Sequence, residues 1–144
     1  MNATRAAAAG FIATGVMTAL LLVEPSVGLP RIAMGQVLST SLGLASAHLA
    51  TGPALGWLIH FLIGMLLALI YAAAFAHRLP GSPLGRGMVY GALVFMVAQL
   101  VFMPLIGGGV FSRGAVDLLI GSLLGHLVYG GLTGWIYGEP QAAA

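Results

Sequence analysis

Four long apolar stretches dominate this sequence, and almost no charged residue interrupts them. They cover residues 6–23, 53–76, 87–106 and 116–137, and segments rich in Pro and Gly separate them. A helix of ~20 apolar residues crosses the ~30 Å hydrocarbon core of a bilayer, so each stretch is long enough, or nearly so, to span it. We therefore predict an all-α, integral membrane four-helix bundle, with residues 1–144 forming a single transmembrane domain.

The composition supports a membrane protein and excludes several other classes. Hydrophobic residues make up 60% of the chain and charged residues 6%, and the mean hydropathy is +1.06. A soluble domain has roughly 25% charged residues. The five basic residues are scattered arginines, so we expect no nucleic-acid partner. The chain has no Cys, which excludes disulfides, thiolate metal sites and a cysteine nucleophile.

One histidine pattern occurs twice, each time inside an apolar stretch. Gly64 and Tyr71 follow His60 at the same offsets at which Gly130 and Tyr137 follow His126. At 3.6 residues per turn, the His, Gly and Tyr of each copy lie on one stripe of a helix. The pattern indicates an internal repeat.

The repeat extends to the first and third stretches, where Arg5 precedes Gly10 as Arg86 precedes Gly91. We therefore predict two tandem helical hairpins, covering about residues 5–78 and 86–138. Each hairpin crosses the membrane twice, so both point the same way and a pseudo-two-fold axis lies along the membrane normal.

The arginines near the helix ends predict the orientation in the membrane. Arg5, Arg78 and Arg86 fall on one side, and Arg31 and Arg113 fall on the other. Because cytoplasmic loops carry an excess of basic residues, this majority places both termini in the cytoplasm.

The first hairpin differs from the second by the long insert before its second helix. Polar residues recur there at steps of three and four, with apolar residues between them. This pattern is typical of an amphipathic helix that lies in the interface between the first and second spans. Residues 32–49 also fit a re-entrant or a spanning segment.

Two histidines are the main candidates for chemistry, because ionisable groups deep inside a membrane are rare. His60 and His126 fit axial ligation of one b-type haem from opposite sides, contact with a quinone, or hydrogen bonding across a helix interface. Tyr71 and Tyr137 share their stripes. Small or hydroxylated residues on the same faces predict that helices 53–76 and 116–137 pack against each other there; they are Gly56, Gly64, Ser122, Gly130 and Thr133.

Three further polar residues lie within or at the end of the apolar stretches. We expect Thr18 and Gln99 to be interhelical hydrogen-bond partners in mid-membrane. Glu24 ends the first helix, where a carboxylate marks the water boundary or holds a proton or a cation. We expect no catalytic residue, because no Gly-x-Ser-x-Gly elbow is present and no acidic residue accompanies either buried histidine. The scattered methionines do not predict a metal site.

The chain resembles a family of small bacterial inner-membrane proteins of unknown function. The similarity covers nearly the whole chain except residues 36–47. It rests on Arg5…Gly10-Phe11-Ile12-Ala13-Thr14…Val16-Met17-Thr18, Gly56-Trp57-Leu58-Ile59-His60-Phe61, Leu79-Pro80-Gly81, Met103-Pro104…Gly107-Gly108-Gly109 and His126-Leu127-Val128-Tyr129-Gly130…Gly134…Tyr137-Gly138. The resemblance implies a four-helix integral membrane protein and brings no reaction or ligand with it.

We expect a non-catalytic accessory subunit that packs against a larger membrane complex, such as a respiratory one. The chain has almost no mass outside the apolar stretches, and its Gly-rich faces suit helix docking. Its partners would be the lipid bilayer and either other membrane subunits or further copies of itself. The alternatives are an electron-transfer protein that binds haem b or a quinone through His60 and His126, and a small transporter or channel.

Overall fold

The computed structural model describes residues 1–43 and 52–139, and these are helical with short connections. No strand occurs in either described range. The bounds of the α-helices are α1 Ala3–Val23, α2 Met34–Ser41, α3 Gly52–Ile70, α4 Pro83–Val97, α5 Met103–Leu105 and α6 Val116–Tyr137. Two 3₁₀ turns, Glu24–Val27 and Val110–Gly114, and two π-helical segments, η3 Tyr71–Phe75 and η4 Ala98–Phe102, extend or join them.

Within the described residues, four helices are long and apolar enough to cross a membrane, as predicted from the sequence. They are Ala3–Val27, Gly52–Phe75, Pro83–Leu105 and Val116–Tyr137. Two of these helices, α1 and α4, begin earlier than the apolar pattern indicates, because a polar capping residue precedes each of them. The Asn2 side chain accepts a hydrogen bond from Arg5 N at 2.9 Å, and Ser82 caps α4 by accepting one from Gly85 N at 3.3 Å.

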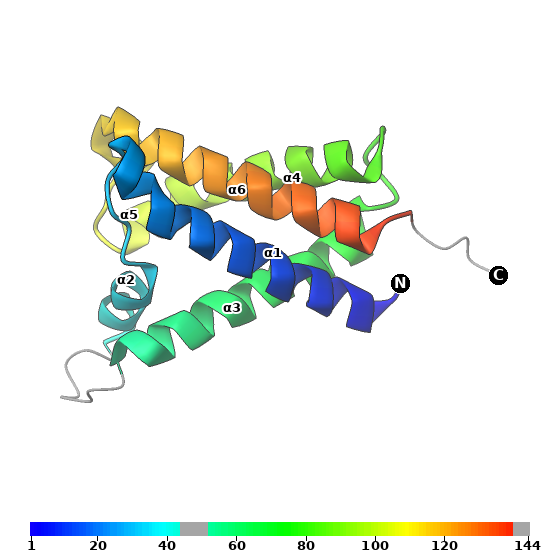
Figure 1. Cartoon of the computed structure of the whole chain (residues 1–144), viewed down its shortest axis with the longest axis horizontal. Helices are drawn as coiled ribbons and strands as arrows, with labels where there is room; N and C mark the ends of the chain where they lie inside the picture. The colour runs from blue at the N-terminus through cyan, green and yellow to red at the C-terminus, as the bar shows by residue number, and fades with distance from the viewer. Residues whose placement is uncertain (44–51, 140–144) are drawn as a thin grey trace.

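The extensive helix pairs are α4–α6, α1–α6, α1–α3 and α2–α3 (Figure 1). The predicted packing of helices 53–76 and 116–137 along whole stripes is therefore wrong. α3 and its extension η3 meet α6 at two points: the ring contact between Tyr71 of η3 and Tyr137, and the hydrogen bond from Tyr129 OH to Gly64 O, 2.6 Å long. Helix α1 lies between α3 and α6, so α1 and α6 form the centre of the bundle.

Glycines bring the helices of each pair into backbone contact. A Cβ on Gly10 of α1 would lie 2.6 Å from both the Gly64 carbonyl oxygen and Ala68 Cβ of α3. Likewise, a Cβ on Gly130 of α6 would lie 2.6 Å from Gly91 Cα of α4. Such small residues let helices associate in lipid through close van der Waals packing. Gly64 and Gly130 of the predicted stripes thus lie in the contacts of the pairs α1–α3 and α4–α6.

The amphipathic segment predicted before the second span is helical over α2, at the end of the bundle remote from the N-terminus (Figure 1). Its buried residues are Gly35, Leu38 and Ser39, a narrower and more polar face than the sequence pattern indicates. The reason is a close approach to α3, because a Cβ on Gly56 would overlap the Gly35 carbonyl oxygen. Residues 44–49 of the predicted segment lie outside the described residues.

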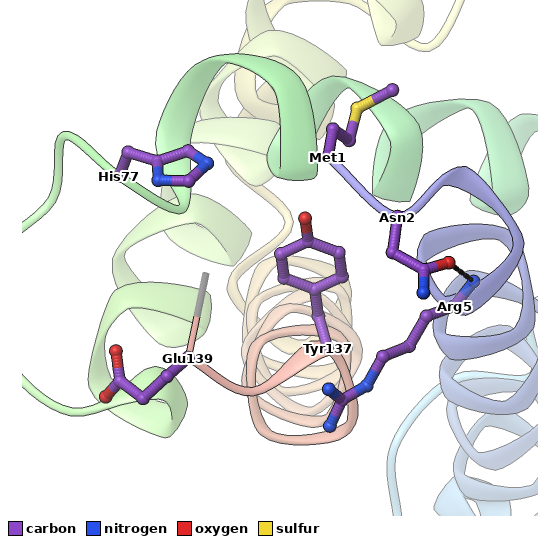
Figure 2. Close-up of a pocket in the computed structure, with 6 residues that line it drawn as sticks. All are labelled: Met1, Asn2, Arg5, His77, Tyr137 and Glu139. Carbon is purple, nitrogen blue, oxygen red and sulfur yellow. Dashed lines mark hydrogen bonds between the residues drawn. The ribbon is translucent and has the colours of Figure 1, made fainter. Parts of the chain in front are cut away.

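The start of α1 and the end of α6 lie together at the other end of the bundle. Arg5 Nε donates a hydrogen bond to the Ile136 carbonyl oxygen at 3.0 Å, which satisfies a terminal carbonyl of α6. Beside it, Figure 2 shows a hollow of about 20 Å³ lined in part by Arg5, His77 and Tyr137. This volume suits a single water molecule.

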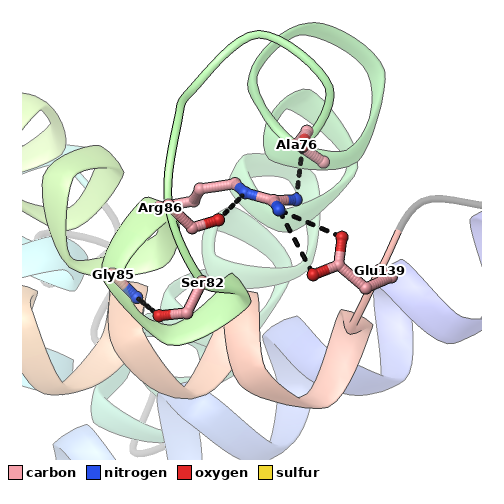
Figure 3. A network of polar contacts seen from close by, with 6 residues as sticks. Ala76, Ser82, Gly85, Arg86 and Glu139 are labelled. Atoms are coloured by element: carbon pink, nitrogen blue, oxygen red, sulfur yellow. Dashed lines mark hydrogen bonds and ion pairs between the residues drawn. The ribbon is translucent and has the colours of Figure 1, made fainter.

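Arg86 joins three helices at this same end (Figure 3). Its guanidinium donates to the carbonyl oxygens of Gly81 at 2.6 Å and Ala76 at 3.1 Å, and it forms an ion pair with Glu139 at 3.0 Å. The start of α4 is thereby tied to the segment that follows α3 and to the residue after α6. The Glu139 side chain is 66% exposed, so the carbonyl contacts contribute more than the ion pair.

Candidate functional site

A cavity of about 490 Å³ opens between α3 and α4, and α1 and α6 form its inner wall. At the tyrosine end, α3 and α4 are held together by the ring contact of Tyr90 with Phe75 and by the hydrogen bond from Tyr90 OH to Leu67 O, 2.7 Å long. Beyond Leu67 the two helices diverge. Residues of the α1–α2 connection and of α2 close the far end of the cavity.

Most of the cavity lining is apolar, and a small number of polar groups converge on it. The apolar wall includes Ile63, Leu67, Val94 and Phe102. The polar residues in the lining are Thr14, Arg31, His60, Gln99, Ser112, Ser122, His126 and Tyr129. An apolar pocket with a few convergent polar groups is the usual form of a small-molecule site.

His126 stands on the cavity wall with one ring nitrogen already bonded. Its Nδ1 lies 2.6 Å from the Ser122 carbonyl oxygen, a distance that requires a proton on Nδ1 because two lone pairs would repel. The neutral ring then carries only a lone pair on Nε2. His126 can therefore accept a hydrogen bond from a ligand, or coordinate a metal ion, through Nε2.

Gln99 connects this histidine to a strained turn. The Ser112 hydroxyl donates to Gln99 Oε1 at 2.9 Å, and Gln99 Nε2 donates to Ser122 Oγ at 3.2 Å. Gln99 lies in η4, a π-helical segment of the kind often found at functional sites. Its predicted role as an interhelical hydrogen-bond partner is confirmed.

Ser112 reaches Gln99 from an unusual backbone conformation. Phe111, Ser112 and Arg113 have φ values of 45°, 49° and 54°, which form a short left-handed turn. For residues with a Cβ this conformation is disfavoured by roughly 1–2 kcal/mol each. Strain of this kind persists where the surrounding contacts impose it, and here the buried Ser112–Gln99 hydrogen bond is one such contact.

His60 is not equivalent to His126, although the sequence pattern pairs them. Its Nε2 is buried and has no hydrogen-bond partner within residues 1–43 and 52–139, and its ring packs edge-on against Trp57 at 5.7 Å. His60 lines the cavity with its ring but does not offer Nε2 to it. A haem held by both histidines would need the His60 ring to turn, so the arrangement as it stands does not fit bis-histidine ligation.

The predicted tyrosines lie outside the cavity. The rings of Tyr71 and Tyr137 contact each other at 6.1 Å near the termini, and both side chains are buried. In the part of the chain that the structure describes, Tyr71 OH has no hydrogen-bond partner. These tyrosines therefore serve as core residues between α3 and α6 in the structure, and they are not placed to touch a ligand in the cavity.

The other predicted residues are divided between the cavity and the helix contacts. Gly64 and Ser122 line the cavity, whereas Gly56 packs on α2 and Gly130 packs on α4. Thr133 is fully buried within the bundle.

Two of the predicted mid-membrane polar residues lie away from the site. The prediction that Thr18 hydrogen-bonds to another helix is wrong, because its buried Oγ1 has no partner among the described residues. Glu24 is only 2% exposed, and its carboxylate lies against Gly121 of α6. It is therefore buried in the bundle rather than placed at an exposed water boundary. Neither residue lines the cavity.

Four residues of the site were not singled out from the sequence: Thr14, Arg31, Ser112 and Tyr129. Ser112 had a usable signal, because Gly107, Gly108, Gly109 and Gly114 surround it and indicate an unusual backbone. In the described residues, no group of three or more His, Asp or Glu side chains is arranged to hold a metal ion.

The fold and the cavity define a bundle of four helices that are able to cross a membrane, with a side cavity between two of them. The chain belongs to the Family of unknown function (DUF6789), whose model matches residues 1–143. No curated protein and no solved structure matches the chain.

Proposed function

We propose that this chain is a multi-pass protein of the bacterial inner membrane that binds a lipophilic molecule of the quinone class in the cavity between α3 and α4. The observation that carries this proposal is the cavity itself, with the Nε2 lone pair of His126 available on its wall. Its volume of about 490 Å³ falls within the ~300–1,000 Å³ typical of ligand pockets.

The position of the cavity favours a ligand that arrives from the lipid. Ile63 and Val97 line it from α3 and α4 and are 39% and 60% exposed. In a bilayer such side chains face the hydrocarbon, so a ligand with an apolar tail can enter sideways without crossing water. Its polar head would then reach Gln99 and His126.

We also propose that the two hairpins are copies of one unit, and this explains where the cavity lies. Equivalent residues meet at a two-fold axis, and the Tyr71–Tyr137 contact has that character. In such an arrangement the α1–α6 and α3–α4 seams correspond. The first is extensively packed, whereas the second is closed only at its tyrosine end. The cavity lies in the open part of the α3–α4 seam, where the bundle departs from two-fold symmetry.

The orientation is part of this proposal. Arg5 and Arg86 both lie at the end where α1 begins and α6 ends, which supports a cytoplasmic position for the termini. The natural chain has no Cys, so single cysteines at Ser82 and Val110 provide a direct test. We expect an impermeant maleimide added outside the cell to label Val110→Cys and not Ser82→Cys; the reverse labelling would refute the orientation.

An accessory subunit of a larger complex is the second candidate function. It is supported by the short described connections between the long helices, which leave little mass outside the membrane. A transporter or channel has less support, because no charged side chain lies among the polar residues on the inner wall of the cavity. Gentle purification from the membrane tests the subunit proposal: a chain that always elutes alone contradicts it, and constant co-purification with one complex supports it.

Ligand binding is tested with the protein in lipid nanodiscs and a radiolabelled decyl-benzoquinone. Val94→Trp fills the cavity, and Val89→Trp adds the same side chain on an exposed face of α4. We expect saturable binding that Val94→Trp weakens at least about tenfold and Val89→Trp leaves unchanged. Binding that is absent from the wild type, or indifferent to Val94→Trp, would refute the proposal. The absorption spectrum of the same sample tests haem b, because a Soret band would support the haem alternative.

A further inference from the structure

The hydroxyl and imidazole donors around the cavity are largely bonded within the protein. Thr14 donates to the Gly10 carbonyl oxygen at 2.7 Å, and Tyr129 donates to the Gly64 carbonyl oxygen at 2.6 Å. The Ser112 hydroxyl is directed at Gln99. What these groups offer to a ligand is therefore mainly lone pairs, and the charged donor among the lining residues is Arg31, which lies on the α1–α2 connection at the far end of the cavity.

His126 also has its donor bonded within the protein and offers a ligand a lone pair. It is the group best placed to distinguish ligands. Its Nδ1 proton is held by the Ser122 carbonyl oxygen, so its Nε2 can only accept. Two donors remain beside it: the second amide hydrogen of Gln99, and the hydroxyl hydrogen of Ser122, whose oxygen accepts from Gln99. The polar end of the cavity thus combines one strong acceptor with two neutral donors.

A hydroxyl group matches this arrangement, and a carbonyl group does not. A hydroxyl can donate its hydrogen to His126 Nε2 while its oxygen accepts from Gln99 or Ser122. A carbonyl oxygen can accept from the same donors, but it would set its lone pairs against the lone pair of Nε2. A buried polar group left unpaired is strongly unfavourable, so the mismatch discriminates between ligands.

We propose that the cavity selects the reduced, hydroxyl-bearing form of its ligand, a hydroquinone, over the oxidised quinone. This inference rests on the proposed function, and it concerns binding alone. The hydroquinone donates one O–H to His126 Nε2 and accepts at the same oxygen from Gln99 or Ser122, while its tail lies along the apolar wall formed by α3 and α4.

The test compares three ligands of nearly equal size under anaerobic conditions: decyl-hydroquinone, decyl-benzoquinone and the dimethyl ether of the hydroquinone. We expect the hydroquinone to bind about tenfold more tightly than either of the others, because only it can donate to His126. Saturable binding of all three with equal affinity, still lost in Val94→Trp, would refute this inference and leave the proposed function intact. The absence of saturable binding for all three would refute the proposed function.

A pair of variants assigns the preference to one residue. His126→Phe keeps an aromatic ring but removes the acceptor, so we expect the tenfold ratio to fall to about one. The control is His77→Phe, which changes an exposed histidine at the opposite end of the bundle and should leave the ratio unchanged. An unaltered ratio in folded His126→Phe would contradict the role of Nε2. If this variant does not fold, the comparison with the dimethyl ether in the wild type still decides.

Discussion

The glycine contact between α4 and α6 makes the sharpest prediction about stability. A methyl group added by Gly130→Ala would overlap the Gly87 carbonyl oxygen and lie 2.6 Å from both N and Cα of Gly91. All of these are backbone atoms, so no side chain can move aside. Carbon atoms pack best at ~3.5–4.0 Å, so α4 would have to retreat by about 1 Å along the contact.

The neighbouring residue provides a matched control on the same helix. A methyl group at Gly131 would lie 3.2 Å from Leu84 Cδ1 and 3.2 Å from Met88 Cγ, which are flexible side-chain atoms. Both substitutions gain roughly 0.5–1 kcal/mol because alanine favours a helix over glycine. Overpacking of a tight core costs about 1–3 kcal/mol. We therefore expect a net loss of about 1–2 kcal/mol for Gly130→Ala and a change within about 0.5 kcal/mol for Gly131→Ala.

Reversible unfolding in mixed micelles measures this difference, with Trp135 of α6 as a fluorescent reporter and circular dichroism as a second signal. The free energy of unfolding should fall in Gly130→Ala alone. Equal stabilities of the two variants would refute the close backbone contact, and with it the helix pairing described above.

Three further outcomes follow from other parts of the structure, each measured by the same unfolding assay. Arg113→Gly should have a free energy of unfolding about 1 kcal/mol higher than Arg113→Ala, because both variants lose the hydrogen bond from Arg113 Nη2 to Gly107 O and only glycine adopts the φ of 54° without strain; equal stabilities would contradict the left-handed turn. Tyr129→Phe should lower it by about 1 kcal/mol through loss of the hydrogen bond to Gly64, and no change would show that bond to be unimportant. Arg86→Ala should be more destabilising than Glu139→Gln, since the carbonyl contacts of the guanidinium are lost as well; the opposite order would assign the stabilisation to the ion pair.

The sequence determined the long helices of this protein, because length and apolar composition alone decide which segments can cross a bilayer. The segments 6–23, 53–76, 87–106 and 116–137 correspond to the four long helices within a few residues at most ends. The larger differences lie at both ends of the first span and at the start of α4, because caps, the 3₁₀ turn Glu24–Val27 and Pro83 extend a helix beyond its apolar part.

Only the tertiary structure decided what each stripe touches. A glycine marks a close approach but does not say to which helix, and Gly64 and Gly130 turned out to contact α1 and α4. His60 and His126 share the Gly and the Tyr that follow them, but Trp57 precedes the first and Ser122 the second. Among the described residues, His60 has a buried Nε2 without a hydrogen-bond partner, and His126 has its Nδ1 bonded to the Ser122 carbonyl oxygen one turn earlier. Residues distant in the chain decide what surrounds Ser122, because Gln99 and Ser112 come together with it only after α4, the left-handed turn and α6 have packed. Periodicity reports which side of a helix is apolar; the partner of that side depends on how all the helices fill space together.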